Sequence, residues 1–178
     1  FINLKRNICL SSCLNIGIRE VKTKYIARMD SDDYSLSERF ELQLKYLKKN
    51  SLNIIGSSVI NKSYKNSRIY NIGHVIENSE IKKKSLNYIP IAHPTFFGKS
   101  KLFKEIMYNE KLIYSQDYDF LIRSLIKNFR IGNLNIPLLI YNQTISNNIN
   151  KIFYQIKISN EISYKYSLYL NNKGEYKL

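Results

Sequence analysis

Three aspartates, Asp30, Asp32 and Asp33, stand close together in a chain whose net charge is +14. Grouped carboxylates repel one another, so they stay ionised together only where water or a cation compensates them. A hard divalent cation such as Mg²⁺ or Mn²⁺ does this through oxygen ligands, and Mg²⁺ is usually held by one or two carboxylates plus phosphates. The alternative interpretation is a solvated acidic turn in which Asp33 or Ser35 caps the next helix.

A second acidic group, in the stretch SQDYDFLIR, places Asp117 and Asp119 at the start of an expected helix. Aspartates there are favourable because they complement the helix dipole. The functional interpretation makes one of them a general base in a crevice. His93, in HPTFFGK, is a lone histidine of the kind that is most often structural or merely exposed.

The stretch DSDDYS also partly matches two other acidic motifs, a calcium-binding loop and a D-x-D phosphatase motif. A calcium-binding loop would need an oxygen ligand where Tyr34 stands and a glycine where Ser35 stands, so it fits poorly. A D-x-D phosphatase would use Asp30 as the nucleophile and Asp32 as the acid. The phosphatase stays open as a lesser alternative.

Hydrophobic periodicity predicts strands and helices that alternate along the chain. The expected strands cover residues 24–30, 53–60, a segment after Pro94, and two further strands within 130–143. The expected helices cover residues 7–21, 35–49, 77–86, 101–107, 117–128 and 148–170. This alternation indicates an α/β fold with a mostly parallel sheet, in which ligand groups lie at the carboxyl ends of strands. The three aspartates occupy such an end, ahead of a capping box formed by Ser35 and Glu38.

The composition is that of a globular protein, with 44% hydrophobic and 24% charged residues in 178. We expect a domain over residues 1–145 and a C-terminal helix and tail over 146–178. No run of residues is long and apolar enough to span a membrane. The positive charge favours anionic partners such as nucleic acid, an anionic membrane or a phosphorylated substrate, or else reflects a solvated lysine-rich surface. Since the chain opens on Phe1 within a helix-like segment, we expect a fragment of a longer protein.

Four segments between Ile8 and Tyr141 carry a family resemblance. They are CLNIGIREVKTKYIARMDSDDYSLSERFELQLKYLKKNSLNIIGSS, HPTFFGK, YSQDYDFLIRSLIKN and IGNLNIPLLIYN. In this order they resemble inverting family 2 glycosyltransferases of the GT-A fold, the type found in bacterial cell-surface polysaccharide synthesis. The resemblance implies a GT-A-like sheet flanked by helices, with the opening strand–helix–strand portion absent. That absence would leave half a donor site and an unpaired sheet edge.

The resemblance also implies roles for individual residues. Asp30 and Asp32 match the D-x-D pair that holds Mn²⁺ or Mg²⁺ against the donor diphosphate, and the adjacent Asp33 is an alternative metal contact. Asp117 matches the base that deprotonates the acceptor hydroxyl. Further residues are expected to shape the donor site, namely Asn15 and Arg28, or to line the acceptor crevice, namely His93, Gln116 and Arg123.

The implied partners are a nucleotide-diphosphate sugar and a saccharide or lipid-linked acceptor, with peripheral membrane contact as an option and no nucleic acid. The implied location is the cytoplasm, with the inner face of the membrane as an option. Gln116 departs from the family pattern, which has a glutamate there. The alternatives left open are an inactive remnant and a basic module that binds nucleic acid or an anionic membrane.

Overall fold

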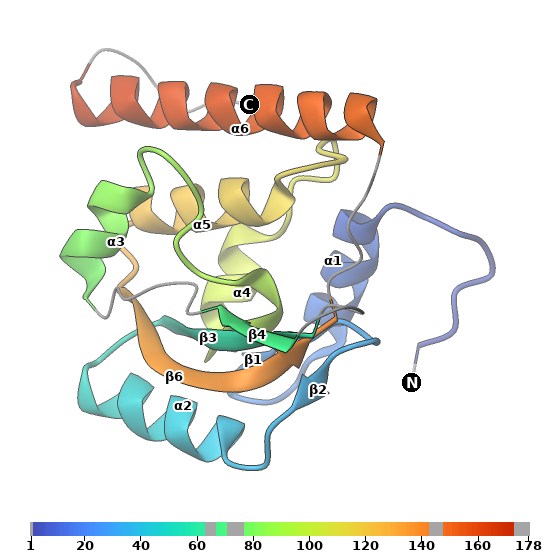
Figure 1. Ribbon diagram of the computed structural model, residues 1–178, viewed down its shortest axis with the longest axis vertical. Helices are drawn as coiled ribbons and strands as arrows, with labels where there is room; N and C mark the ends of the chain where they lie inside the picture. The colour runs from blue at the N-terminus through green and yellow to red at the C-terminus, as the bar shows by residue number, and fades with distance from the viewer. Residues whose placement is uncertain (1, 63–66, 71–76, 143–147, 173–178) are drawn as a thin grey trace.

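The computed structural model describes residues 2–62, 67–70, 77–142 and 148–172, with residues 67–70 described by their backbone alone. The helices are α1 (Leu10–Glu20), α2 (Arg39–Lys49), α3 (Asn78–Lys84), α4 (Ser100–Ile106), α5 (Gln116–Ile126) and α6 (Ile149–Leu170), with a 3-10 turn η1 (His93–Thr95). The strands are β1 (Tyr25–Ala27), β2 (Tyr34–Ser35), β3 (Ile54–Lys62), β4 (Ser67–Tyr70), β5 (Phe97–Lys99) and β6 (Ile131–Tyr141). The predicted alternation of strands and helices is confirmed (Figure 1), but residues 130–143 hold one strand, β6, and not the two strands we expected.

One sheet runs through the molecule in the order β1-β5-β3-β6-β2, and β4 pairs with β3. Among the described strands only β3 and β6 are parallel, whereas the other four pairings are antiparallel. The α/β class is therefore confirmed, but the prediction of a mostly parallel sheet is wrong. Connection length does not decide strand direction here, because β1 and β5, and likewise β2 and β6, are separated by long helical connections and still pair antiparallel. These directions follow from long-range pairing, which no local pattern reports.

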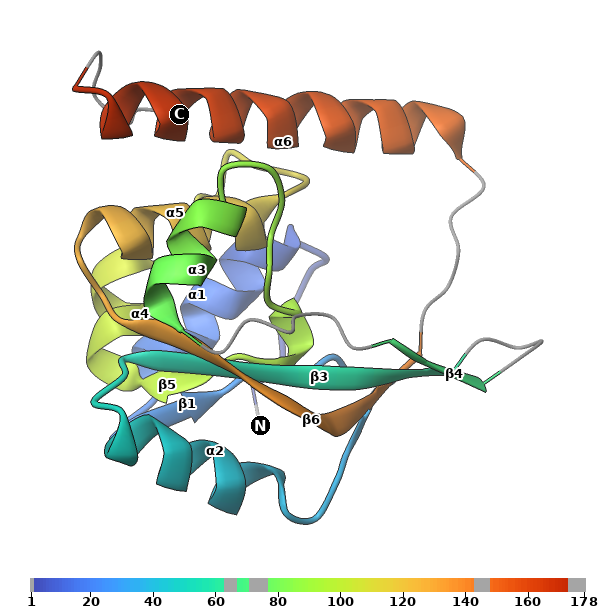
Figure 2. The same ribbon diagram turned by 60° about the vertical axis from the view of Figure 1, so that its left-hand side comes forward.

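Helices cover both faces of the sheet. Figures 1 and 2 show α2 against one face, and α1, α3, α4 and α5 on the other, with α6 outside α5. The smaller core cluster, under α2, consists of Leu47, Leu52, Ile55, Phe97, Leu134 and Leu138. The larger cluster joins the sheet to the opposite helices and reaches α6 through Ile162 and Tyr166. This two-sided burial fixes the sheet whose strand ends carry the acidic residues.

The two halves of α6 differ in burial. Ile162 and Tyr166 in the C-terminal half are almost fully buried, whereas every residue from 149 to 157 is exposed. The apolar residues Ile152, Phe153 and Ile156 lie in this exposed half. Figure 2 shows the N-terminal end of α6 projecting beyond α5. No helix in the described ranges combines the length and the apolarity that crossing a membrane requires.

The predicted capping box before α2 is wrong. Tyr34 and Ser35 pair with Ile140 and Leu139 of β6, which draws Ser35 into the sheet. Glu38 takes the N-cap position and makes no side-chain cap hydrogen bond. Long-range strand pairing has overridden a local sequence signal here, and as a result β2 follows the aspartates directly.

Candidate active site

The acidic turn, as we call residues 30–33, connects β1 to β2. Its backbone closes where the Asp33 N–H donates to the Asp30 carbonyl, 3.3 Å away. Asp32 is exposed, Asp30 is partly exposed, and Asp33 is buried. The three predicted metal-binding residues therefore share one turn but differ in their access to solvent.

Asp33 anchors the acidic turn to the end of β6. Its Oδ1 accepts a hydrogen bond from the Asn142 backbone N–H at 3.0 Å, and the Asn142 side chain donates to the Asp32 carbonyl. Asp33 Oδ2 is enclosed and has no hydrogen-bond partner among the residues that the structure describes. Burial raises the pKa of Asp33, and the neighbouring charges of Asp30 and Asp32 raise it further. These contacts assign Asp33 a structural part in the turn, and they leave Asp30 and Asp32 as the more accessible carboxylates.

Arg28 lies at the end of β1, beside the acidic turn. Its guanidinium forms an ion pair with Asp30 through Nη2, and the side chain is only 8% exposed. Arg28 Nε and Nη1 are enclosed and have no acceptor in the described part of the chain. A cationic side chain is thus buried against the carboxylates with part of its hydrogen-bonding capacity unused.

The buried pair Arg39 and Gln43, from α2, holds the backbone around the acidic turn. Arg39 Nη2 donates to the carbonyls of Arg28 (2.7 Å) and Pro94 (3.0 Å), and Gln43 Nε2 donates to the carbonyl of Thr95 (2.8 Å). Burial lowers the pKa of Arg39 to about 10, so the guanidinium stays charged at neutral pH. Arg39 and Gln43 therefore tie the strand before the acidic turn to the HPT segment.

Asp117 lies in the first turn of α5. It is partly buried, and its Oδ1 accepts a hydrogen bond from the Tyr118 N–H at 2.9 Å. Burial is the main cause that raises the pKa of Asp117, while the charge of Arg28 lowers it and that of Asp30 raises it. The structure therefore brings Asp117, Arg28 and Asp30 within electrostatic reach of one another.

The start of α5 is also joined to α6. Ser115 precedes the helix with a positive φ of 56°, and its Oγ shares a hydrogen bond with Ser159 Oγ at 2.8 Å. Tyr114 stacks edge-on against Tyr154 with ring centroids 5.8 Å apart. The Gln116 side-chain carbonyl is enclosed without a donor. The exposed half of α6 consequently borders the segment that presents Asp117.

Asn15 and His93 have protein partners that account for their burial. The Asn15 amide is bonded to both the N–H and the carbonyl of Tyr108, at 2.7 and 2.9 Å, and also to Glu110. His93 Nε2 lies 2.8 Å from the Tyr108 hydroxyl, and burial lowers the pKa of His93 well below its usual range. These contacts organise the segment after α4, and the predicted donor and crevice roles stay predictions.

Arg123 is engaged in the protein interior. It donates to Asp119 Oδ2 and to the carbonyls of Ile106 and Met107 at the end of α4. All three guanidinium nitrogens are used, so the structure gives no support to its predicted place in the acceptor crevice. Sequence reasoning missed Asn142 and Tyr108, although Asn142 carried a usable signal as a polar residue directly after a buried strand.

Comparison with known proteins decides the family. The family model described as glycosyl transferase family 2 matches residues 1–108. The chain belongs to this family. It is 35% identical over 145 residues to the O-antigen biosynthesis glycosyltransferase WbnJ of Escherichia coli, covering 74% of this chain and 52% of WbnJ. It is 30% identical over 124 residues to the E. coli UDP-Gal:α-D-GlcNAc-diphosphoundecaprenol β-1,3-galactosyltransferase, covering 68% and 45% of the two chains.

The fold also matches a solved structure. S. aureus TarS 1-349 in complex with UDP-GlcNAc superimposes with a TM-score of 0.66 at 14% identity, covering 96% of this chain and 54% of TarS 1-349. This family 2 chain therefore has part of the GT-A fold, as predicted. It spans about half the length of the relatives it matches. Membership in the family favours a transferase over a D-x-D phosphatase.

The residues of the acidic turn fit one kind of metal site. The described residues contain no group of three or more His, Cys, Asp or Glu side chains able to enclose a metal ion. The available ligands are Asp30, already in contact with Arg28, and the exposed Asp32. Two carboxylates suit a Mg²⁺ or Mn²⁺ ion that completes its coordination with water and phosphate oxygens. They do not suit an ion bound by protein ligands alone.

Proposed function

We propose that this family 2 chain contributes the carboxylate part of a site that transfers a sugar, with inversion, from a nucleotide-diphosphate sugar to an acceptor hydroxyl. The pathway we propose is the synthesis of a cell-surface polysaccharide or lipopolysaccharide. The observation that carries the proposal is the shared electrostatic environment of Asp117, Asp30 and Arg28. The relatives active in O-antigen and diphosphoundecaprenol-linked sugar synthesis support the choice of pathway.

Asp30 and Asp32 would hold Mn²⁺ or Mg²⁺ in this site. When bound, such an ion offsets the negative charge that develops on the departing diphosphate. The backbone of the turn is fixed for this task by Asp33 and Asn142 on one side and by Arg39 on the other. A site prepared in this way needs little rearrangement when the donor arrives.

Asp117 would act as the general base. The acceptor oxygen attacks the anomeric carbon from the side opposite the diphosphate, the bond from that carbon to the phosphate oxygen breaks, and the hydroxyl proton passes to Asp117. Burial raises the pKa of Asp117, which makes its carboxylate a stronger base, while the charge of Arg28 limits the rise. The hydrogen bond from the Tyr118 N–H orients the carboxylate.

We further propose that the exposed half of α6 lies on an anionic membrane surface and places a lipid-linked acceptor near Asp117. Four exposed apolar residues recur at positions i, i+3, i+4 and i+7: Ile149, Ile152, Phe153 and Ile156. Lys151 and Lys157 lie among them, and α6 contains no acidic residue before Glu161. An apolar stripe flanked by lysines is typical of helices that bind at the interface of an anionic bilayer.

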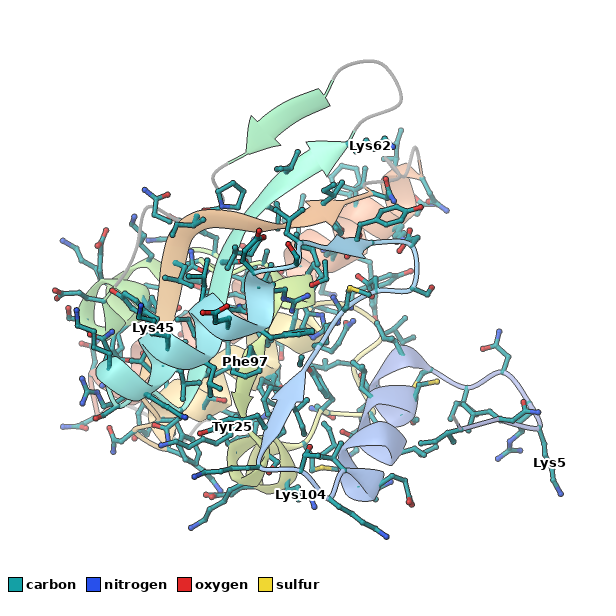
Figure 3. The ribbon with its side chains drawn as sticks, turned by 90° about the horizontal axis from the view of Figure 1, so that it is seen from below. Lys5, Tyr25, Lys45, Lys62, Phe97 and Lys104 are labelled. Carbon is teal, nitrogen blue, oxygen red and sulfur yellow. The ribbon has the colours of Figure 1, made fainter. Side chains whose placement is uncertain are left out.

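The lysines outside α6 indicate a binding partner less clearly than those of α6 do. Figure 3 shows Lys5, Lys45, Lys62 and Lys104 on well-separated parts of the molecule. They belong respectively to the N-terminal segment, α2, β3 and α4. This dispersion gives no support to a nucleic-acid module, which usually gathers its basic and aromatic residues on one face.

The transfer reaction is tested by nucleotide release from UDP-galactose and UDP-N-acetylglucosamine in the presence of Mn²⁺. We expect Asp117→Asn to lower the rate by about 10²- to 10⁴-fold, the range typical for loss of a general base. Asp32→Asn should cause a loss of comparable size. Glu105→Gln removes one exposed carboxylate elsewhere and serves as the control. Equal rates in all four proteins would contradict the site assignment.

Membrane contact is tested by sedimentation with phosphatidylglycerol vesicles and with phosphatidylcholine vesicles. We expect binding to the anionic vesicles alone, with a loss of at least about fivefold in Phe153→Ser, since an interfacial aromatic contributes one or more kcal/mol. Tyr164→Ser is the matched control, because Tyr164 and Phe153 are exposed to similar extents, 64% and 67%. Equal binding by both variants, or none by the wild type, would contradict the assigned surface.

A further inference from the structure

Arg28 is incompletely paired for a buried cation. Its side chain is 8% exposed, and Nη2 alone meets a carboxylate, that of Asp30. The enclosed Nε and Nη1 have no acceptor among the described residues. Burying charged donors without acceptors is costly, so such groups call for an explanation beyond packing.

The main chain at Arg28 is held by two backbone hydrogen bonds, whereas its side chain has one ion pair. The Arg28 N–H donates to the Phe96 carbonyl at 2.8 Å, and the Arg28 carbonyl accepts from Arg39 Nη2 at 2.7 Å. The guanidinium itself is held by the single ion pair with Asp30. Any adjustment at this position would therefore come from side-chain rotation about a stationary backbone.

Asp30 has two possible cationic partners, the guanidinium of Arg28 and a divalent metal ion. Asp30 Oδ1 is in contact with Arg28 Nη2, so a divalent ion bound to Asp30 would have to share the carboxylate with the guanidinium. A guanidinium and a divalent ion on one carboxylate would also repel each other. Asp32 is exposed and free of this constraint.

We propose that Arg28 competes with the divalent cation for Asp30 and releases Asp30 only when the donor diphosphate arrives and accepts hydrogen bonds from Arg28. The inference rests on the proposed function and specifies how that site is controlled. Arginine suits the exchange, because its planar guanidinium donates bidentate hydrogen bonds to carboxylate and phosphate alike. The cation and the diphosphate would then each strengthen the binding of the other, as linkage requires.

The first test measures Mn²⁺ binding to the protein by the electron paramagnetic resonance signal of free Mn²⁺. Arg28→Met frees Asp30, and we expect its Mn²⁺ affinity to rise about tenfold, equivalent to about 1.4 kcal/mol. Arg130→Met makes the same change in net charge at an exposed, distant arginine and should leave the affinity unchanged. Arg28→Gln replaces Arg28→Met if the latter fails to fold.

A double-mutant cycle separates direct competition from a general effect of charge. If Arg28 acts through Asp30, the tenfold gain disappears when Arg28→Met is combined with Asp30→Asn. A gain that persists in the Asp30→Asn background would overturn the proposal. A wild-type protein that binds Mn²⁺ as tightly as Arg28→Met does would also overturn the proposal. That result would not contradict the proposed transfer reaction.

The second test uses the preformed Mn²⁺–pyrophosphate complex, followed by water-proton relaxation. Wild type should bind the complex more tightly than Mn²⁺ alone, and Arg28→Met should lose about tenfold in affinity for the complex. If Arg28→Met binds the Mn²⁺–pyrophosphate complex as tightly as wild type does, the proposal that Arg28 exchanges Asp30 for the diphosphate is overturned. If no variant binds Mn²⁺ in any form, both this proposal and the metal-dependent part of the proposed function fail.

Discussion

Arg123 and Arg28 each face an aspartate, but the two arginines are held in opposite ways. Arg123 uses all three guanidinium nitrogens, on Asp119 and on the end of α4. Arg28 uses one nitrogen on Asp30, although it is the more buried of the two, 8% exposed against 26%. The first pair joins α4 to α5 within the core, and the second borders the acidic turn.

The contrast separates charges that stabilise the fold from charges that are available for chemistry. A buried group that is needed for structure normally has all its hydrogen bonds satisfied. Groups left partly unsatisfied tend to lie where a ligand or a reaction completes them. Arg28, with two enclosed donors that lack an acceptor among the described residues, therefore stays in the proposed site together with Asp117, whereas the contacts of Arg123 join α5 to the end of α4.

The largest effect should come from Arg123→Met. Loss of Arg123 leaves the carboxylate of Asp119, 1% exposed, without its arginine, and removing one partner of a buried ion pair costs roughly 3 kcal/mol. Urea unfolding followed by circular dichroism measures this loss. Because Asp30 is 36% exposed and can hydrate, Arg28→Met should change the free energy of unfolding by less than about 1 kcal/mol. Equal losses of unfolding free energy in Arg123→Met and Arg28→Met would show that the two arginine–aspartate pairs do not differ in this way.

A smaller effect should appear in the titration of Asp117, read from its carboxyl carbon shift by NMR. Burial raises the pKa of Asp117 above its ordinary value of 3.8. Since the charge of Arg28 lowers this pKa and that of Asp30 raises it, Arg28→Met should move the midpoint to higher pH and Asp30→Asn to lower pH. Because a base acts when deprotonated, activity should fall as the pH drops through the same midpoint.

Arg123→Lys is the control for that titration, because it keeps the charge at position 123 and Arg123 is not among the groups that shift Asp117. We expect its Asp117 midpoint to match that of the wild type. Shifts of the same sign in Arg28→Met and Asp30→Asn would show that Asp117 does not sense the acidic turn.

Local patterns were sufficient to predict much of the fold. The helical periodicity after Ser35 and Asp117 and the apolar run before Asp30 correctly predicted α2, α5 and β1. Strand direction was not predictable in this way, because β5 and β2 join the sheet through contacts between segments far apart in the chain. The same long-range pairing of Ser35 with Leu139 replaced the predicted capping box.

The candidate site was predictable in its acidic residues but not in their partners. The position of the aspartates at a strand end follows from residue type and order. The bond between Asp33 and Asn142 joins positions 109 residues apart, and no local pattern reports it. Arg123 carried the charge and position expected of a crevice residue, but its hydrogen bonds to the end of α4 could not be read from the sequence, and its crevice role stays a prediction.

Paramagnetic broadening by Mn²⁺ in the amide NMR spectrum tests most directly whether the acidic turn and Asp117 share one cleft. We expect substoichiometric Mn²⁺ to broaden the amide signals of residues 28–33 together with those of Asp117 and Tyr118. The signals of Lys48 and Lys49, at the far end of α2, should stay sharp, and Asp32→Asn should abolish the effect. Broadening of residues 28–33 while Asp117 and Tyr118 stay sharp would contradict a common site.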